Sequence, residues 1–533
     1  MKKTIKKLAA VGLTLTSVMS LVACGNDDGG AGNQGGGNSG NESKEITKPT
    51  DEITIMVDNT VVTESNGGEA FYKYLMELTG LKLKFIRPDH NGYYDAVASA
   101  FASDAQPDVV LLSSDYYALY ASNGFLWNMT DAWENSDLKK SGRLIATADN
   151  IFNALKVNGE DGTKAMYGFS PYRGNGCCTF IKKSWLEASN IDVSKVQGVT
   201  MDWNTYYGYL KQMAADKGHY VISAPDFISL EAPYTNYLPE FYQNAQFTFY
   251  QNASGQFVDG FSEKAMQDAL QRLQDGVKDG VLDKASLGQK TSDARNKFYS
   301  TDAASEAGVF TYWAGTWANT LKQNLEAKGL DGTLIAINPI KELGTYVERI
   351  APAWCITSEA KNPEGIFKYF IESMLDGGDV QTAWEYGAKG THWDDKAESV
   401  TIAKKEDDVK TYKEGEFHML PQPEKPDTWM PKNHIDPILA LAKFNGSGDP
   451  GQGAITQVAR ENGEWFATVS KVATPLPMTE VLGLNITDIN TARQEVISKV
   501  TLGEWTVEEG MNQYKSKVGS NVEACLKSLN GQK

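Results

Sequence analysis

The sequence predicts an α/β fold in which a parallel β-sheet lies between layers of helices. Three observations support this prediction. Short apolar runs rich in β-branched residues recur near residues 53, 81 and 108, segments with apolar residues at helical spacing separate them, and glycine, proline or polar residues mark the boundaries. Such alternation is typical of βαβ units, whose strands are parallel and whose sheet is covered on both faces.

The first predicted strand covers residues 53–57 and ends at the polar pair Asp58 and Asn59. A helix is predicted over residues 71–78, because its apolar residues are spaced three and four apart. Gly80 follows where a helix C-cap is expected.

A second strand is predicted over residues 81–86, and a helix around Val97 and Phe101 leads to a third strand over 108–112. Ligands of parallel sheets bind beyond the carboxyl ends of the strands. The residues expected on that rim are Asp58, Asn59, Ser114, Asp115 and Tyr116.

Beyond residue 160 the pattern is a mixture of short strands and helices. Strands are expected over 165–169, 178–181 and 351–356, helices over 206–213, 265–277 and 363–375, and a helical tail from residue 485. Cys177 and Cys178 are adjacent, and two buried residues on a strand are favoured over a strained vicinal disulfide.

The N-terminus has the pattern of an export signal. Four lysines precede a 16-residue uncharged run, Leu8–Ala23, which is shorter than the ~20 residues that span a bilayer. Residues 21–24, Leu-Val-Ala-Cys, resemble the lipobox of bacterial lipoproteins, which implies cleavage before Cys24 and acylation (palmitate) of its thiol. Eight of the next sixteen residues are glycine, which predicts a flexible tether.

Composition excludes some classes of partner. Without the four leader lysines the chain has 47 basic and 68 acidic residues. Such a surface is unsuited to nucleic acid, whose binding depends on Lys and Arg contacts to phosphate. No cofactor motif is present, and no cysteine or histidine spacing of the metal-binding kind occurs.

Several segments after residue 50 resemble motifs of the extracellular solute-binding proteins of carbohydrate ABC transporters (family 1), the class that includes maltose-binding protein. The segments are 106–110 with Asp115 and 124–126 (PDV…D…GLL in the family), 161–168 (DGKxYG), 182–186, 202–204 (TWDE), 308–317 (ending in GPW) and 362–364 (NPE). Residues 386–393 resemble the YGxEGxHY signature of a longer lipoprotein branch. Some members of that branch carry a calcium loop, but residues 215–219 offer one carboxylate there, so no metal is expected.

The resemblance implies a two-lobed periplasmic-binding-protein-like fold (type II), each lobe a sheet flanked by helices, with hinge crossings near 172–176 and 350–352. The expected parts are a signal peptide (1–23), an anchor and tether (24–50), an N-terminal lobe (51–172 plus about 350–385) and a C-terminal lobe (173–349 plus about 386–533).

Sugar sites combine aromatic faces with polar groups for hydroxyls, and the chain has 12 Trp and 24 Tyr. A single aromatic residue more often belongs to the core. The resemblance gives Trp317 a stacking role and Asp115 a hydroxyl-accepting role, although a helix N-cap is an alternative for Asp115. Arg173 is either a bidentate ligand contact or a surface residue. The candidate contacts are Asp58, Asn59, Asp115, Tyr116, Tyr172, Arg173, Tyr234, Trp313, Trp317, Trp354, Trp384, His392 and Trp393.

The expected function is therefore that of a non-catalytic, monomeric binding protein. It is lipid-anchored at the outer face of a Gram-positive type cell membrane and delivers an oligosaccharide to ABC permease subunits. A surface glycoside hydrolase would share the aromatic residues and the anchor, but it needs two carboxylates facing the sugar. A binding protein for a non-sugar solute is the other alternative.

Overall fold

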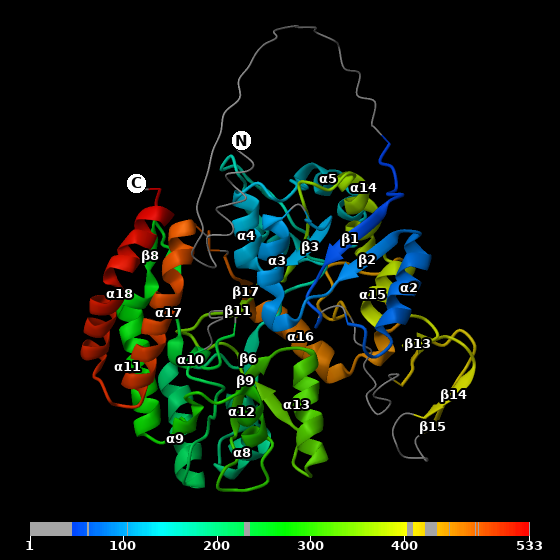
Figure 1. The fold of residues 1–533 in the computed structure, drawn as a ribbon. Coiled ribbons are helices and arrows are strands. Elements are labelled where there is room, and N and C mark those ends of the chain that lie inside the picture. The colour runs from blue at the N-terminus through cyan, green and yellow to red at the C-terminus, as the bar shows by residue number, and fades with distance from the viewer. Residues whose placement is uncertain are drawn as a thin grey trace, which may run out of the picture.

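The computed structural model describes residues 45–531 except 61–62, 104, 229–234, 402–408, 422–433, 447, 475 and 478. The predicted signal peptide, Cys24 and nearly all of the tether lie outside the described residues, as does the candidate contact Tyr234. Figure 1 shows two lobes, one above the other, with β11 (Tyr346–Glu348), β17 (Ser470–Val472) and α16 (Gln457–Val469) between them.

The first lobe is built on a four-stranded sheet in the order β12-β3-β1-β2. β1 (Glu52–Met56) pairs in parallel with β2 (Lys82–Ile86) and β3 (Val109–Leu112), while β12 (Ala353–Ile356) is antiparallel to β3. The helices around it are α2 (Gly68–Thr79), α3 (Tyr93–Ala102), α4 (Ser114–Ser122), α5 (Thr130–Asn135), α6 (Asp137–Lys140), α7 (Ala148–Ala154), α14 (Pro363–Ile366) and α15 (Asp379–Tyr386). The predicted strand–helix alternation is confirmed.

Local sequence explains the first helix of this lobe. The side chains of Phe71, Tyr72 and Leu75 on α2 are buried against the sheet, as helical spacing predicts. Gly80 ends the helix with φ 64° and donates its N–H to the carbonyl of Met76, because a residue without Cβ adopts this left-handed conformation without strain.

The predicted helix over 363–375 is irregular. α14 begins after Asn362, whose side chain accepts the Gly365 N–H, and it continues as a π-helical turn (Phe367–Ile371) and a 3₁₀ turn (Glu372–Leu375). The changes of pitch keep Phe370, Ile371 and Met374 buried, so packing rather than ideal geometry decides the path of this segment.

The second lobe contains a three-stranded sheet in the order β10-β6-β9, with β6 (Cys177–Lys182) antiparallel to β10 (Leu334–Ala336) and β9 (Val309–Trp313). Cys177 and Cys178 are buried on β6, as expected. The helices of this lobe are α8 (Lys183–Ala188), α9 (Trp203–Lys217), α10 (Pro239–Tyr242), α11 (Lys264–Lys278), α12 (Thr291–Phe298), α13 (Thr316–Ala327), α17 (Glu480–Thr501) and α18 (Val507–Leu529).

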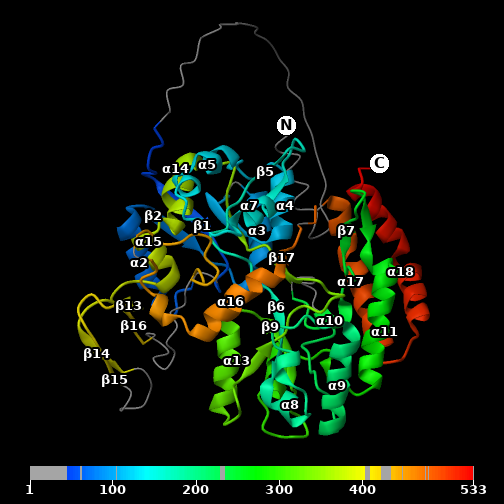
Figure 2. The same cartoon turned by 180° about the vertical axis from the view of Figure 1, so that it is seen from behind.

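The C-terminal helices α17 and α18 lie against α11 at one side of the second lobe (Figures 1 and 2). Arg493 on α17 is fully buried, donates to Asp259 at 2.8 Å and lies over the ring of Phe249. Because a buried guanidinium needs a charge partner, this contact fixes how the tail packs on the lobe.

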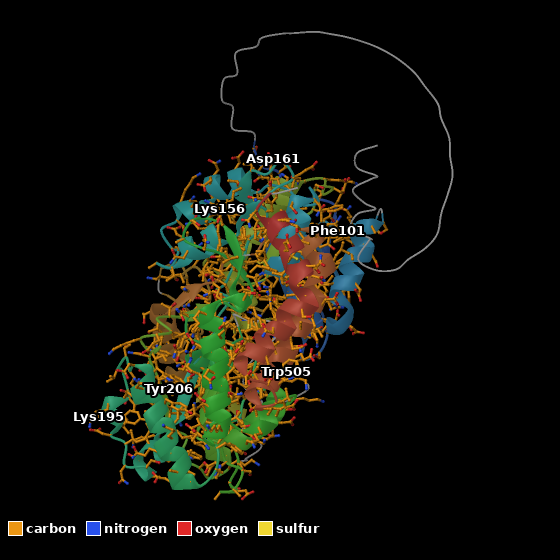
Figure 3. The ribbon with its side chains drawn as sticks, turned by 90° about the vertical axis from the view of Figure 1, so that its left-hand side faces the viewer. Phe101, Lys156, Asp161, Lys195, Tyr206 and Trp505 are labelled. Atoms are coloured by element: carbon orange, nitrogen blue, oxygen red, sulfur yellow. The ribbon has the colours of Figure 1, made fainter. Side chains whose placement is uncertain are left out.

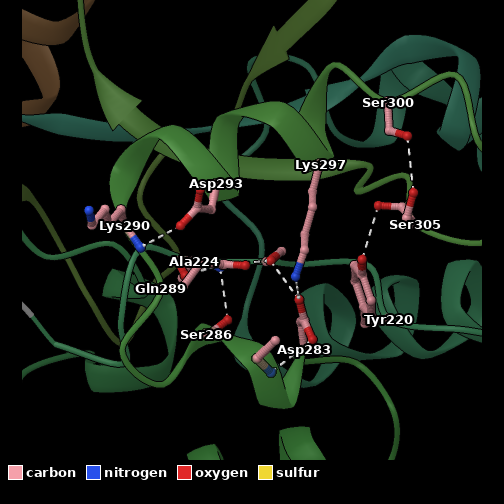
Figure 4. Close-up of polar contacts among 12 residues, drawn as sticks. Tyr220, Ala224, Asp283, Ser286, Gln289, Lys290, Asp293, Lys297, Ser300 and Ser305 are labelled. Carbon is pink, nitrogen blue, oxygen red and sulfur yellow. Dashed lines mark hydrogen bonds and ion pairs between the residues drawn. The ribbon is translucent and has the colours of Figure 1, made fainter.

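A polar network fastens the loops around α12 (Figure 4). Lys297 donates to Asp283 at 2.6 Å, and Ser223 donates to the same carboxylate oxygen at 2.7 Å. Tyr220 donates to the carbonyl of Ser305. These bonds satisfy the polar groups of loops that carry no regular ladder.

Residues 215–219, which stand where some members of the longer branch carry a calcium loop, form the end of a helix. Asp216 lies in α9, Gly218 is its left-handed C-cap, and the ammonium of Lys217 lies 4.4 Å from the Trp185 ring centroid.

The main hydrophobic clusters locate the crossings between lobes. Phe169 and Ile350 belong to the first cluster, whereas Cys178 and Tyr346 belong to a cluster of the second lobe. The chain therefore crosses between 169 and 178 and returns between 346 and 350, next to the predicted positions.

The expected assignment of residues from about 386 onward to the second lobe does not hold for residues 435–442. Ile435 and Ala440–Ala442 pack in the core of the first lobe. The hairpin of β14 (Glu398–Thr401) and β15 (Val409–Tyr412) extends from the side of the first lobe in Figure 1, near β13 (Trp393–Asp394). Farther along the chain, α16 packs on α13 of the second lobe.

Candidate ligand-binding site at the lobe junction

The carboxyl end of β1 carries the polar pair predicted there. Asp58 accepts from the backbone N–H and hydroxyl of Thr60, and its Oδ2 lies 2.6 Å from Nδ1 of His90. Burial opposes ionisation of Asp58, but the hydrogen bonds from Thr60 and His90 outweigh it and hold its pKa below the ordinary value. Asn59 donates to Asp89 at 2.9 Å, so both residues fix the loop after β2.

An aromatic pair lies beside this loop. The rings of Tyr94 on α3 and Tyr116 on α4 are stacked at 3.7 Å between centroids with 4° between their planes. The Tyr94 hydroxyl accepts the backbone N–H of Ser113 at 2.9 Å, and burial raises its pKa. Both side chains are only partly buried, so this pair forms a flat polarisable surface at the rim of the sheet.

The second lobe contributes tryptophans at the end of β9 and the start of α13. Trp313 and Trp317 are partly buried, and each is packed against a guanidinium: Arg349 lies 5.0 Å from the Trp313 ring and Arg295 lies 4.9 Å from the Trp317 ring. Tyr312 contacts the edge of Trp317 at 4.8 Å between centroids. Cation–π contacts of this kind hold the indole rings in fixed orientations.

The turn before α13 joins these tryptophans to the rest of the junction. Gly315 has φ 70° and ψ −118°, a conformation that favours glycine, and its N–H donates to Asn462 on α16 at 2.7 Å. Thr316 donates to Asp436 at 3.0 Å. Asp436 comes from the segment attached to the first lobe, so this hydrogen bond links the two lobes; burial raises the pKa of its carboxyl.

The crossing strands are held by a buried ion pair. Arg173 donates through Nε and Nη2 to the two carboxylate oxygens of Glu348, at 2.9 and 2.6 Å, and the side chains are 5% and 4% exposed. Tyr172 next to it forms a bridge with Ala440 and is half-buried, and burial raises its pKa although Arg349 opposes this. The first and second crossings are thus linked by two parallel charge-assisted hydrogen bonds.

The family model of the bacterial extracellular solute-binding proteins matches residues 63–375, more than half of the chain. The chain belongs to this family. No curated protein sequence matches it. The family implies an extracellular or periplasmic location and a role in solute capture for transport.

Solved solute-binding proteins share the fold at low sequence identity. The N-glycan transport solute-binding protein NgtS from Streptococcus pneumoniae is 17% identical with a TM-score of 0.56, over 90% of this chain and 98% of that one. The alginate-binding protein AlgQ2 without calcium ion is 17% identical with a TM-score of 0.55, over 92% of this chain and 99% of that one. A family 1 solute-binding protein from Alicyclobacillus acidocaldarius is 15% identical with a TM-score of 0.55, over 90% of this chain and 99% of that one. These matches show the two-lobed periplasmic-binding-protein fold of this solute-binding protein.

Two candidate tryptophans lie in the core of the first lobe. Trp354 on β12 and Trp384 on α15 are 2% and 1% exposed and contact each other edge to face at 5.7 Å. Trp384 also packs on Phe71 and Phe370. Burial of both indoles leaves no face for a solute in this conformation, so their role here is packing.

The residues of the long-branch signature join the segment after α15 to the first lobe. His392 accepts the Ala388 N–H through Nδ1 and lies 2.7 Å from the Asn66 carbonyl through Nε2, so Nε2 carries the proton. Trp393 is 7% exposed and stacks on Phe417 at 4.8 Å.

The alternative that Arg173 is a surface residue is wrong, because Arg173 is 4% exposed. Its bidentate partner in the structure is Glu348. Asp115 is the second residue of α4, after the N-cap position Ser113, so it is not the N-cap; its side chain lies outside the described atoms.

Sequence reasoning missed Tyr94, Arg295, Arg349 and Asp436. The adjacent tyrosines at 93 and 94, directly after the turn at 90–92, were a usable signal for the first. The two arginines and Asp436 had none, since their partners lie 22 to 120 positions away in the chain.

In the described ranges, no group of three or more His, Cys, Asp or Glu side chains is arranged to hold a metal ion. Nor does any helix within them combine the length and apolar character that a bilayer span requires.

Proposed function

We propose that this solute-binding protein captures an oligosaccharide between its lobes and passes it to an ABC permease without chemical change. The observation that carries the proposal is the presence of aromatic faces on both sides of the junction: the Tyr94–Tyr116 pair on the first lobe, and Trp313 and Trp317 on the second. Sugar rings present apolar C–H faces, which pack on such surfaces.

The polar groups nearby suit hydroxyl recognition. Arg295 and Arg349 lie on the tryptophan rings and form no ion pair within the described part of the chain. Guanidinium groups held this way offer paired donors to adjacent hydroxyls. Asp58 and Asn59, which follow β1, and Asp115, in the first turn of α4, are the candidate acceptors and donors of the first lobe.

The structural relatives support the same class of solute. One similar structure is NgtS in complex with Man1GlcNAc, and another is a maltose-bound T. maritima MalE3. With identities of 17% and 14% the sugar itself does not transfer to this chain, but the oligosaccharide class agrees with the aromatic pattern.

Lobe closure is the proposed signal to the permease. The lobes are joined by crossing strands, and an oligosaccharide that contacts both lobes binds the closed arrangement more tightly. It therefore raises the closed population, which the permease recognises.

We further propose that the mature chain is a monomeric lipoprotein held through Cys24 at the outer face of a Gram-positive type membrane. The tether keeps the receptor beside its permease. Metabolic labelling with palmitate tests this: a Cys24→Ser variant is expected to lose the label and appear in the medium. Equal labelling of both proteins would contradict the anchor.

A thermal-shift screen over neutral, acidic and amino oligosaccharides tests the function. A sugar that raises the melting temperature is expected to lose this effect in Trp313→Ala and Trp317→Ala. Trp505→Ala, in the turn between α17 and α18 (Figure 3), is the matched control and retains it. Stabilisation by no carbohydrate would contradict the proposal. New reducing ends on incubation would favour a glycoside hydrolase instead.

A further inference from the structure

A cavity of about 430 Å³ lies at the hinge, away from the aromatic residues of the proposed sugar site. Its walls come from the first lobe (Thr147–Lys164), both crossing strands (Arg173 and Glu348) and the segment 467–474 that includes β17. Figure 2 shows α7 and β5 (Lys164–Met166) above β17 on this side of the molecule. A volume of this size accommodates a small molecule.

The charge of the lining is opposite to that of the protein. Four basic side chains, Lys156, Lys164, Lys471 and Arg173, line the cavity against one carboxylate, Glu348. The whole chain has a net charge of −17. Glu348 is already neutralised by its bidentate bond with Arg173. The three lysines, of which Lys164 and Lys471 are exposed and Lys156 is half-buried, therefore give the rim of the cavity a net positive charge.

The three lysines have no partner within the described part of the chain. Their side-chain ammonium groups form no ion pair and no hydrogen bond there, whereas several other lysines of the protein pair with carboxylates. Asn150 and Asn153, one turn apart on α7, add amide donors to the same wall. The hydroxyl of Ser470, another lining residue, is buried without a hydrogen-bond partner in that part of the chain.

We propose that this cavity is a second binding site, distinct from the sugar site, for a small multivalent anion of the polycarboxylate or phosphate class. The lysines would supply the charge and the asparagines directional hydrogen bonds. Lys156 lies on β4 (Lys156–Asn158) of the first lobe and Lys471 on β17, which pairs with β11 of the second crossing. An anion that contacts both depends on the angle between the lobes, so its binding is linked to lobe closure.

Calorimetric titration of the full-length chain with citrate and with inorganic phosphate tests the site, with sodium chloride at matched ionic strength as the reference. One-site binding is expected. Lys156→Gln, Lys164→Gln and Lys471→Gln are each expected to weaken it about five- to tenfold. Lys195→Gln, an exposed lysine at the opposite end of the molecule (Figure 3), is the matched control and leaves it unchanged.

The proposal would be overturned if neither anion bound, or if Lys195→Gln weakened anion binding as much as the three cavity variants. It would also be overturned if only Lys156→Gln and Lys164→Gln weakened binding, because the anion would then lie on one lobe only. Trp313→Ala, which removes a sugar contact, is expected to keep full anion binding. Failure of the sugar screen therefore leaves this test intact, and loss of anion binding in Trp313→Ala would show that the two sites are one.

Discussion

Removing Arg173 from the hinge is the sharpest test of how the lobes are joined. Arg173 and Glu348 are 5% and 4% exposed and share two hydrogen bonds of 2.9 and 2.6 Å. Arg173→Met leaves the Glu348 carboxylate buried without its counter-charge. Loss of one partner of a buried pair costs about 3–5 kcal/mol, whereas an exposed pair is worth about 0.2–1 kcal/mol.

The double variant Arg173→Met/Glu348→Leu separates the attraction between the charges from the cost of burying them. Because both charges are then absent, most of the lost stability is expected to return, to within roughly 1–2 kcal/mol of the parent protein. The i,i+4 pair of Lys264 and Asp268 on α11 is the matched control, since its side chains are 76% and 49% exposed. Lys264→Met is expected to change stability by no more than about 0.5 kcal/mol.

Urea unfolding followed by far-ultraviolet circular dichroism gives the free energies of unfolding, and tryptophan fluorescence shows whether both lobes unfold in one transition. A cost below about 1 kcal/mol for Arg173→Met would refute the reasoning, because it would mean that the pair is hydrated. A double variant as unstable as the single variant would also refute it, because the buried unpaired charge would then not be the cause.

Four further perturbations follow from the geometry. Burial lowers the pKa of His392 in the folded protein. The contribution of neutral His392 to stability is therefore complete above the ordinary pKa of 6.5 and is lost as the pH falls below it. His392→Gln should make the melting temperature less dependent on pH between about pH 7 and 5, and an unchanged slope would contradict this. Burial raises the pKa of Glu240 from 4.5 to about 7. The pH dependence of stability then has the opposite sign, because stability is lost as the pH rises between these two values. Glu240→Gln should abolish that loss in the same melting series. Gly315→Ala should cost about 1–3 kcal/mol of stability. The cost comes from the positive φ alone, because the nearest atom to a new Cβ is 3.8 Å away. Urea unfolding measures this cost, and Gly208→Ala, in the middle of α9 with open space around it, should not destabilise the protein. Trp384→Ala should cost about 3–5 kcal/mol in the same assay, and a loss of sugar binding without loss of stability would instead return Trp384 to the binding site.

The elements of the first lobe were predictable because their signals are local. The strands near residues 53, 81 and 108 were recognised from short apolar runs, and α2 from its buried stripe and its glycine cap. The antiparallel β12 was recognised as a strand, but its place beside β3 was not, since β12 lies more than 240 positions later in the sequence.

The candidate site was only partly predictable for the same reason. Trp313 and Trp384 are indistinguishable as residue types, yet one is half-buried beneath Arg349 and the other is enclosed by Phe71 and Phe370. Whether an indole face is covered depends on partners that only folding brings near. Tyr116 was predicted, but its stacking partner Tyr94 was not, because a ring-to-ring contact between two helices leaves no periodic signal.

The sequence by itself determined the α/β class, the family and the polar strand ends at Asp58 and Asn59, because these depend on residue patterns over a few consecutive positions. Only the tertiary structure decided that Arg173 neutralises Glu348, that residues 435–442 pack in the core of the first lobe, and that three lysines from different segments line one cavity. Charge compensation and burial are sums over neighbours in space, and those neighbours are set by packing and not by the order of the chain.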